Sequence, residues 1–266
     1  MSSTTVNGMT YVSSSDAASI DDDLMGELNY TLEQLMELAG LSVAQSFYDA
    51  YCTNHQHTMS TYNILVIVGP GNNGGDALVA ARHMYMFGLH NITILYPTIN
   101  KSCKKNQHYS KLTEQCKSLG ISVYEQLIDI QPHSCSGSSN TISSYTHIID
   151  GIFGFSYNSS GGIRSPFDAV IQYMIQQHDD SHTQIISIDC VSGYDVNGGD
   201  VNNIGLSADM LVSLTTPKLF AVNYTGIHYI GGRFIWNEFA QKHKLSVPQY
   251  NGCQQFVNIT HKNSNM

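Results

Sequence analysis

The sequence predicts an α/β fold of the Rossmann-like class, in which a doubly wound, mostly parallel sheet carries helices on both faces. Short apolar runs that end in glycine or aspartate, such as residues 64–68, are typical of strands buried on both sides. Helical patterns alternate with these runs, and the alternation indicates βαβ units with right-handed crossovers. The length of 266 residues suits one domain with a sizeable core.

Three regions follow one another along this single domain, residues 1–266. Residues 1–13 are small and polar, and we expect a frayed, flexible tail. Residues 14–53 have helical periodicity and should form N-terminal helices, with Thr31 as the N-cap of the second. Residues 60–245 should form the Rossmann-like core. Within it we expect strands at 64–68, 92–96, 121–124, 147–150, 185–189 and 210–214, helices at 77–83, about 104–118 and 166–176, and an exposed, mobile Ser-rich loop at 134–144.

The composition argues against several classes of function. The net charge of −9 disfavours a broad basic surface for nucleic acid, and the run 64–68 is far shorter than the roughly 20 apolar residues of a membrane span. Residues 1–80 contain no Lys or Arg, so neither a secretory signal nor a mitochondrial transit peptide is indicated. We therefore expect a soluble, cytoplasmic protein. The six cysteines form no CxxC pair and no zinc-type spacing, which favours reduced thiols.

Polar sequences follow four of the expected strands. They are residues 69–76, 150–157, 189–195 and 215–218. Ligands of open parallel sheets bind outside the carboxyl ends of the strands. Because all four segments should meet at that edge, together they indicate one ligand site more strongly than any single motif does.

The first of these segments is the turn Gly69-Pro-Gly-Asn-Asn-Gly-Gly-Asp76. Glycine amides at a helix N-terminus favour phosphate or pyrophosphate. The turn lacks the lysine of a P-loop, so nucleotide hydrolysis is not predicted, and it matches G-x-G-x-x-G incompletely. Turn chemistry alone explains any one of Asn72, Asn73 and Asp76, but the whole run favours a functional role.

Asp150 and Asp189 each end an apolar strand. Taken singly, either could serve only to cap the following helix. Together with Asn73 and Ser192 they would supply hard oxygen ligands, which suit an alkali cation or Mg²⁺ better than zinc. Ser192 lacks a G-x-S-x-G context, so a serine hydrolase is not predicted.

Several motifs occur in the order in which one known family carries them. They are the turn and helix at 69–83, Asp150-Gly-Ile-Phe-Gly-Phe-Ser156, the segment 188–196, Leu214-Thr-Thr-Pro-Lys218, the Gly-Gly-Arg-Phe of 231–234 and Leu35-Met-Glu-Leu-Ala-Gly40. Over about residues 14–245 the chain resembles the NAD(P)H-hydrate epimerase family, also called the YjeF N-terminal domain.

This resemblance implies a Rossmann-like enzyme that interconverts the R and S forms of hydrated NADH or NADPH, so that a separate dehydratase can restore the cofactor. It implies a potassium ion, one per subunit, on Asn73, Asp150 and Ser192. Asp189 is our choice for the catalytic acid and base. The family also implies a homodimer. The expected substrate-binding residues are Asn72, Asn73, Gly74, Gly75, Asp76, Gly154, Phe155, Ser156, Tyr157 and Asp189.

The chain departs from the family pattern at a few positions, and two other functions stay open. Val191 and Tyr194 replace the usual Pro and Trp, and 156–164 is longer than expected and lacks a Lys often found there. One alternative is a non-catalytic dimerisation or scaffold module of the kind found in mRNA-decay proteins, although this chain keeps the site carboxylates. The other is an NAD(P)-dependent oxidoreductase. Residues 96–100 lack the charged ribose selector that an oxidoreductase would need, although Lys101 follows.

Overall fold

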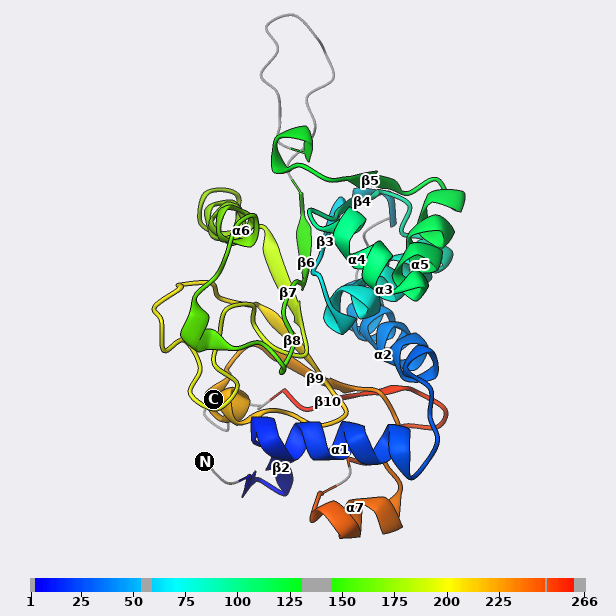
Figure 1. The fold of residues 1–266 in the computed structure, drawn as a ribbon, viewed down its shortest axis with the longest axis vertical. Coiled ribbons are helices and arrows are strands. Elements are labelled where there is room, and N and C mark those ends of the chain that lie inside the picture. The colour runs from blue at the N-terminus through cyan, green and yellow to red at the C-terminus, as the bar shows by residue number, and fades with distance from the viewer. Residues whose placement is uncertain (1–2, 54–58, 131–144, 247, 261–266) are drawn as a thin grey trace, which may run out of the picture.

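The computed structural model describes residues 3–53, 59–130, 145–246 and 248–260 (Figure 1). The Ser-rich segment 134–144, which the sequence predicts as a mobile loop, lies outside the described residues. The main sheet has the strand order β10-β9-β8-β7-β6-β3-β4-β5 and is parallel except for β10. Its strands are β3 (Ile64–Val68), β4 (Ile92–Leu95), β5 (Ser122–Tyr124), β6 (His147–Gly151), β7 (Gln184–Ile188), β8 (Met210–Leu214), β9 (Ile227–Gly231) and β10 (Phe256–Asn258).

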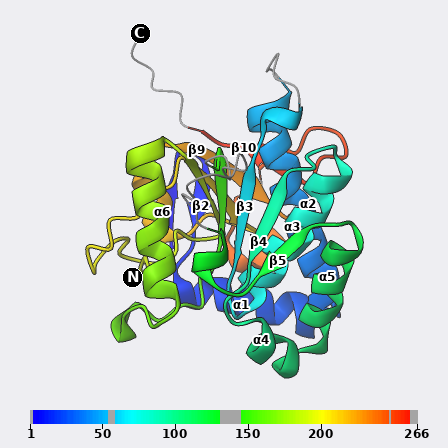
Figure 2. The same cartoon turned by 90° about the horizontal axis from the view of Figure 1, so that it is seen from above.

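Helices cover both faces of this sheet, which confirms the predicted fold class. The view from above in Figure 2 places α6 on one side and α2, α3 and α5 on the other. The chain winds outward from the centre in two directions, with β4 and β5 beyond β3 and with β7 to β9 beyond β6. The helices are α1 (Ser14–Gly26), α2 (Leu32–Phe47), α3 (Asn72–Met86), α4 (Ile99–Lys105), α5 (Gln107–Ser118), α6 (Phe167–Ser181) and α7 (Asn237–His243).

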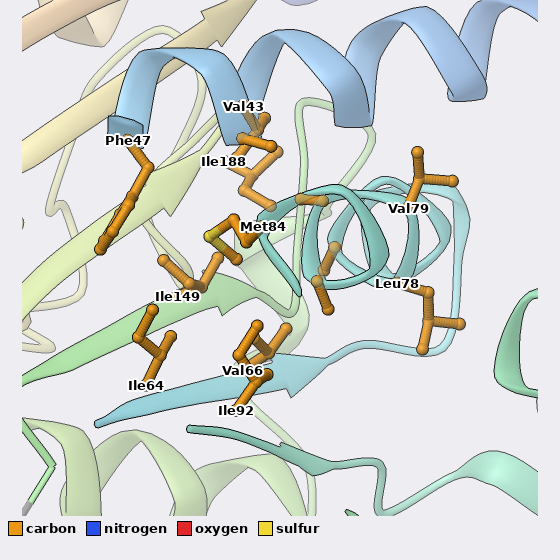
Figure 3. Packing of buried hydrophobic residues seen from close by; sticks show 14 of the residues in the cluster. Val43, Phe47, Ile64, Val66, Leu78, Val79, Met84, Ile92, Ile149 and Ile188 are labelled. Atoms are coloured by element: carbon orange, nitrogen blue, oxygen red, sulfur yellow. The ribbon is translucent and has the colours of Figure 1, made fainter. Parts of the chain in front are cut away.

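The central strand β3 illustrates why an unbroken apolar run is needed here. All five of its residues are fully buried. Ile64 and Val66 pack in the cluster between the sheet and helices α2 and α3 (Figure 3), whereas Leu65 and Ile67 belong to the cluster under α6. Because successive side chains of a strand point to opposite faces, both faces require apolar residues.

The N-terminus differs from the expected frayed tail. Residues 4–11 form a hairpin of β1 (Thr4–Val6) and β2 (Met9–Tyr11), and Tyr11 and Val12 are fully buried. Val12 pairs its backbone with the segment around Lys218 through hydrogen bonds from Val12 N to Pro217 O (2.8 Å) and from Leu219 N to Val12 O (3.0 Å). Backbone pairing and two apolar side chains therefore outweigh the polar composition that suggested disorder.

Other differences are local. The single helix expected at about 104–118 is two helices, α4 and α5, that meet at Asn106. The backbone of Asn106 is extended, and its side chain accepts a hydrogen bond from His108 N at 2.9 Å, so this residue caps α5. Strands β9 and β10 were not anticipated, and β10 has only three residues. No helix among the described residues is long and apolar enough to cross a membrane.

His147, at the start of β6, provides a test of the core. Its ring contacts Phe47, Tyr51 and Tyr62, and burial lowers its pKa to about 4. Between pH 6.5 and 4, the histidine is protonated in the unfolded chain, where its pKa is about 6.5, but stays neutral in the folded protein. We therefore expect the free energy of unfolding to decrease by about 3 kcal/mol, because of His147, as pH falls from 6.5 to 4. His147→Phe should flatten that part of the denaturation-versus-pH curve, and an unchanged curve would contradict the assignment.

Candidate active site

A cavity of about 300 Å³ lies at the carboxyl ends of β3, β6 and β7. The chain leaves β3 and β6 in opposite directions, so this edge is the switch point at which open α/β sheets bind ligands. The segments expected to meet after these three strands do meet here. The lining residues are Pro70, Gly71, Asn72, Asn73, Asp76, Ile152, Phe153, Gly154, Phe155, Ser156, Tyr157, Asn158 and Asp189. A cavity of about 400 Å³ beside the C-terminal end of α2 involves none of them.

The turn after β3 is glycine-rich because backbones approach closely there. A Cβ atom at Gly69 would lie 1.9 Å from the carbonyl oxygen of Ile152, and one at Gly74 would lie 2.2 Å from the carbonyl oxygen of Gly69. Gly75 likewise makes room for the sulfur of Met36 from α2. Gly74 and Gly75, which are expected to bind the substrate, therefore lie behind the residues that line the cavity. Their small size lets α3 pack closely against the turn at Gly69 and against Met36 of α2.

The side chain of Asn72 is held in place from another helix. The hydroxyl of Tyr109, on α5, donates to Asn72 Oδ1 at 2.7 Å. Asn73, the next residue, is 7% exposed, and its Nδ2 has no hydrogen-bond partner in the described part of the chain. A buried amide without a partner is rare in folded proteins and calls for a missing ligand, ion or water.

Asp150 ties the segments after β6 and β7 together instead of capping a helix. It is fully buried, and it accepts hydrogen bonds from Ser187 Oγ (2.8 Å), from Ser192 Oγ (2.5 Å) and N (3.0 Å), and from Ile152 N (3.3 Å). Ser192 Oγ in turn accepts from Phe153 N at 3.1 Å. Burial raises the pKa of Asp150, whereas these hydrogen bonds act in the opposite direction.

Asp189 forms a buried ion pair with Lys218. The Lys218 ammonium contacts Asp189 Oδ1 and also donates to the carbonyl oxygens of Leu214 (2.8 Å) and Thr216 (3.2 Å), while Asp189 Oδ2 accepts from Phe155 N at 2.8 Å. Burial alone lowers the pKa of Lys218, but the Asp189 carboxylate outweighs burial and raises it. Lys218 is therefore charged, and pairing with it requires the ionised form of Asp189.

No role is predicted for Lys218 from the sequence, although it lies in one of the four polar segments expected at this edge. The signal was its position at the end of the Thr-Thr-Pro-Lys run after β8. Only the fold reveals that the chain after β8 turns back toward Asp189.

Two neighbouring strands end in the same strained turn. Asp189 follows β7 with φ of 65°, and Thr215 follows β8 with φ of 66°. In each case the next residue donates its N–H to the carbonyl of the last strand residue at 2.7 Å, which closes a three-residue turn around the strained residue. Turns of this kind with a positive φ are rare and strained. Asp189 thus lines the cavity directly from this turn.

Asp76 is a second buried carboxyl group of the cavity. It is 8% exposed and has no hydrogen-bond or ion-pair partner among the described residues. Burial raises its pKa well above the usual value, and the negative charges of Asp189 and Asp21 raise it further. Asp76 and Asn72 also line a smaller cavity of about 90 Å³, which Asp21 of α1 lines as well. Burial raises the pKa of Asp21 to about 6; the Lys218 charge opposes this rise, and the charges of Asp189 and Asp22 add to it.

The fold and the cavity define a Rossmann-like α/β protein with a polar site at its topological switch point. The chain belongs to the family described as YjeF-related protein N-terminus, which it matches over residues 32–220. It is 40% identical over 253 residues to a Puccinia graminis f. sp. tritici protein named NAD(P)H-hydrate epimerase, with 95% of both chains covered. A Dictyostelium discoideum protein of the same name is 39% identical over 256 residues, with 96% of this chain and 98% of that one covered.

A solved structure agrees with these relatives. The crystal structure of yeast ynu0 matches with a TM-score of 0.80 at 33% identity, and the match covers 94% of this chain and 99% of that one. The family predicted from the sequence motifs is thus confirmed.

Proposed function

We propose that this protein is an NAD(P)H-hydrate epimerase, an isomerase that interconverts the R and S forms of hydrated NADH or NADPH. The observation that carries this conclusion is the end-to-end similarity to the Puccinia and Dictyostelium proteins of that name, over at least 95% of this chain. The geometry is consistent with it. The turn 69–76 leads into the N-terminus of α3, a position that favours the pyrophosphate of a dinucleotide.

The reaction consists of the loss and return of a hydroxyl group. C6 of the hydrated nicotinamide carries the hydroxyl and is bonded to the ring nitrogen. Departure of the oxygen as water therefore leaves an iminium-type cation, and addition of water to the opposite face gives the other epimer. A site for this reaction needs a proton donor, a proton acceptor and a negative charge near the ring.

Asp189 is the residue to which we assign proton acceptance and charge stabilisation. Lys218 and the amide of Phe155 hold its two carboxylate oxygens, so the group is fixed at the wall of the cavity. A carboxylate fixed in this way opposes the positive charge of the ring without having to reorganise. It can also take the proton released when water adds.

We propose potassium as the resident cation, with Asn73, Asp150 and Ser192 as its ligands. Asp150 is a fully buried carboxylate with no cationic partner among the described side chains. The available donors are oxygens, and the described residues contain no group of three His, Cys, Asp or Glu side chains that could hold a metal. Such donors suit a hard cation better than zinc. When bound, the ion would supply positive charge to Asp150.

Asp150→Asn is expected to remove the effect of potassium on thermal stability. A cation that binds only the folded chain raises the Tm of the wild-type protein when KCl replaces choline chloride at equal ionic strength. The variant lacks the negative charge, so its Tm should be the same in both salts. Asp180→Asn, an exposed position on α6, is the matched control and should respond like the wild type. A normal potassium response in Asp150→Asn would reject the ligand assignment.

Three finer features are proposed on the family resemblance alone. They are a homodimeric state, a cytoplasmic location, and action together with a separate NAD(P)H-hydrate dehydratase. The absence of a membrane-spanning helix from the described residues is compatible with the proposed location. Sedimentation analysis of the full chain tests the dimer directly.

An epimer-exchange assay tests the function itself. Hydrated NADH enriched in one epimer is incubated with and without the protein, and the approach to the equilibrium mixture is followed by chromatography. We expect a large acceleration by the protein. A folded protein that gives no acceleration would instead support the scaffold function, and net hydride transfer would support an oxidoreductase.

A further inference from the structure

The two buried aspartates of the cavity differ in their surroundings. Asp189 is paired with Lys218 and accepts a hydrogen bond from Phe155. Asp76 lines the same cavity from the second turn of α3, and no described side chain or amide binds its carboxyl group. When two carboxyl groups of one site have such unlike environments, one serves as the acid and the other as the base.

We propose that Asp76 is the proton donor to the leaving oxygen, and that Asp189 stays ionised beside Lys218 until water adds. This inference rests on the proposed epimerase function. It assigns a chemical step to Asp76, for which the sequence predicts only substrate binding.

The titratable groups that face Asp76 come from four segments. Asp189 follows β7, Asp21 lies on α1, Lys218 follows β8, and the neutral phenol of Tyr109 comes from α5. Two of these groups are carboxyls and one is an ammonium, and that ammonium is bound to Asp189. A second negative charge at Asp76 would be buried and uncompensated, which is unfavourable, so Asp76 keeps its proton.

The proposed step balances as follows. Asp76 gives its proton to the C6 hydroxyl oxygen, the C6–O bond breaks with its electron pair on the departing water, and the nitrogen lone pair forms the C=N bond. Water then adds to the opposite face, its oxygen forms the new C6–O bond, and its surplus proton passes to Asp189. One proton has moved from Asp76 to Asp189. The reverse conversion, or exchange with solvent, returns it.

The smaller cavity offers a route for that exchange. Asp76 and Asn72 line both cavities, and the partly exposed Asp21 lines only the smaller one. A carboxyl group with a pKa of about 6, as at Asp21, exchanges protons readily near neutral pH. Asp21 thus influences Asp76 through its charge without lining the larger cavity.

Asp76→Asn keeps the size of the side chain and removes the transferable proton. We expect kcat for epimer exchange to fall about 100- to 10,000-fold. In the wild type the rate should fall as pH rises through the raised pKa of Asp76, and the variant should lack this fall. Asp180→Asn, at an exposed position of α6, is the matched control and should behave like the wild type.

Asp21→Asn provides a sharper test. Removing its negative charge should move the loss of rate to lower pH, because a neutral neighbour no longer favours the protonated form of Asp76. A merely structural role for Asp76 would leave the pH profile unmoved in both variants, and that outcome would overturn the proposal.

Infrared difference spectroscopy gives a readout that does not depend on turnover. The wild-type protein minus Asp76→Asn should contain the carbonyl stretch of a protonated, buried carboxylic acid at neutral pH, and the stretch of an ionised carboxylate there would refute the assignment. An inactive wild-type protein would reject the epimerase function itself. An active wild type with a fully active Asp76→Asn variant would reject only the role of Asp76.

Discussion

Asp189→Asn is expected to lower kcat for epimer exchange by about 1,000-fold or more, because the variant loses both the proton acceptor and the charge that opposes the cationic ring. The backbone should remain as it is, since asparagine also tolerates the left-handed conformation that Asp189 adopts at φ of 65°. Stopped-flow or chromatographic measurement of exchange, corrected for the uncatalysed rate, gives the comparison. Turnover like that of the wild type would remove Asp189 from the mechanism.

The pH profile separates the roles of the two aspartates. If Asp76 is the donor, Asp189→Asn should still lose rate at high pH, whereas Asp76→Asn should not. Because the Asp189→Asn variant leaves the Lys218 ammonium buried without its partner, circular dichroism must first establish that the protein is folded. The double variant Asp189→Asn/Lys218→Met removes both charges and serves as the folded reference.

Lys218→Met is expected to destabilise the protein by about 3–5 kcal/mol, the usual cost of leaving one partner of a buried ion pair uncompensated. Lys218 is 3% exposed, and its ammonium also satisfies two backbone carbonyls, of Leu214 and Thr216. Urea denaturation at pH 7 measures the loss. The methionine fills a similar volume, so the effect isolates the charge from the packing.

A double-mutant cycle completes this test. Asp189→Asn/Lys218→Met should recover much of the stability that each single variant loses, because no unpaired charge remains. Lys242→Met, at an exposed lysine that pairs with Asp23 and Glu27, should leave stability nearly unchanged. Strictly additive losses from the two single variants would mean that Asp189 and Lys218 are not energetically coupled.

Much of the architecture could be predicted because the relevant physics is local. The run 64–68 has no polar residue to place in solvent, so it had to be a strand buried on both faces. The glycines that follow it predict a tight turn. Because ligands of parallel sheets bind at the carboxyl ends of the strands, Asp150 and Asp189 are expected at the same edge of the sheet, where they lie. Eight of the ten expected substrate-binding residues line the cavity, all but Gly74 and Gly75.

What could not be predicted depends on contacts between distant segments. Asp189 and Lys218 are 29 positions apart, and the segment between them contains no signal that the two side chains meet. The sequence places Asp76 at the substrate, but its raised pKa depends on Asp189 and Asp21, which only the fold brings near it. The break between α4 and α5 could have been predicted, because asparagine at position 106 is a favourable N-cap. The helical periodicity continues across this residue, however, and therefore favours a single helix.

The N-terminal hairpin has a practical consequence for anyone who expresses this protein. Val12 supplies the backbone hydrogen bonds on which Pro217 and Leu219 depend, and Lys218 lies between them. The polar composition of residues 1–13 suggests that they could be removed. A shortened protein that starts at Ser14 would, however, release the loop that carries Lys218, the partner of Asp189. Purification tags are therefore better attached ahead of an intact first strand than substituted for it.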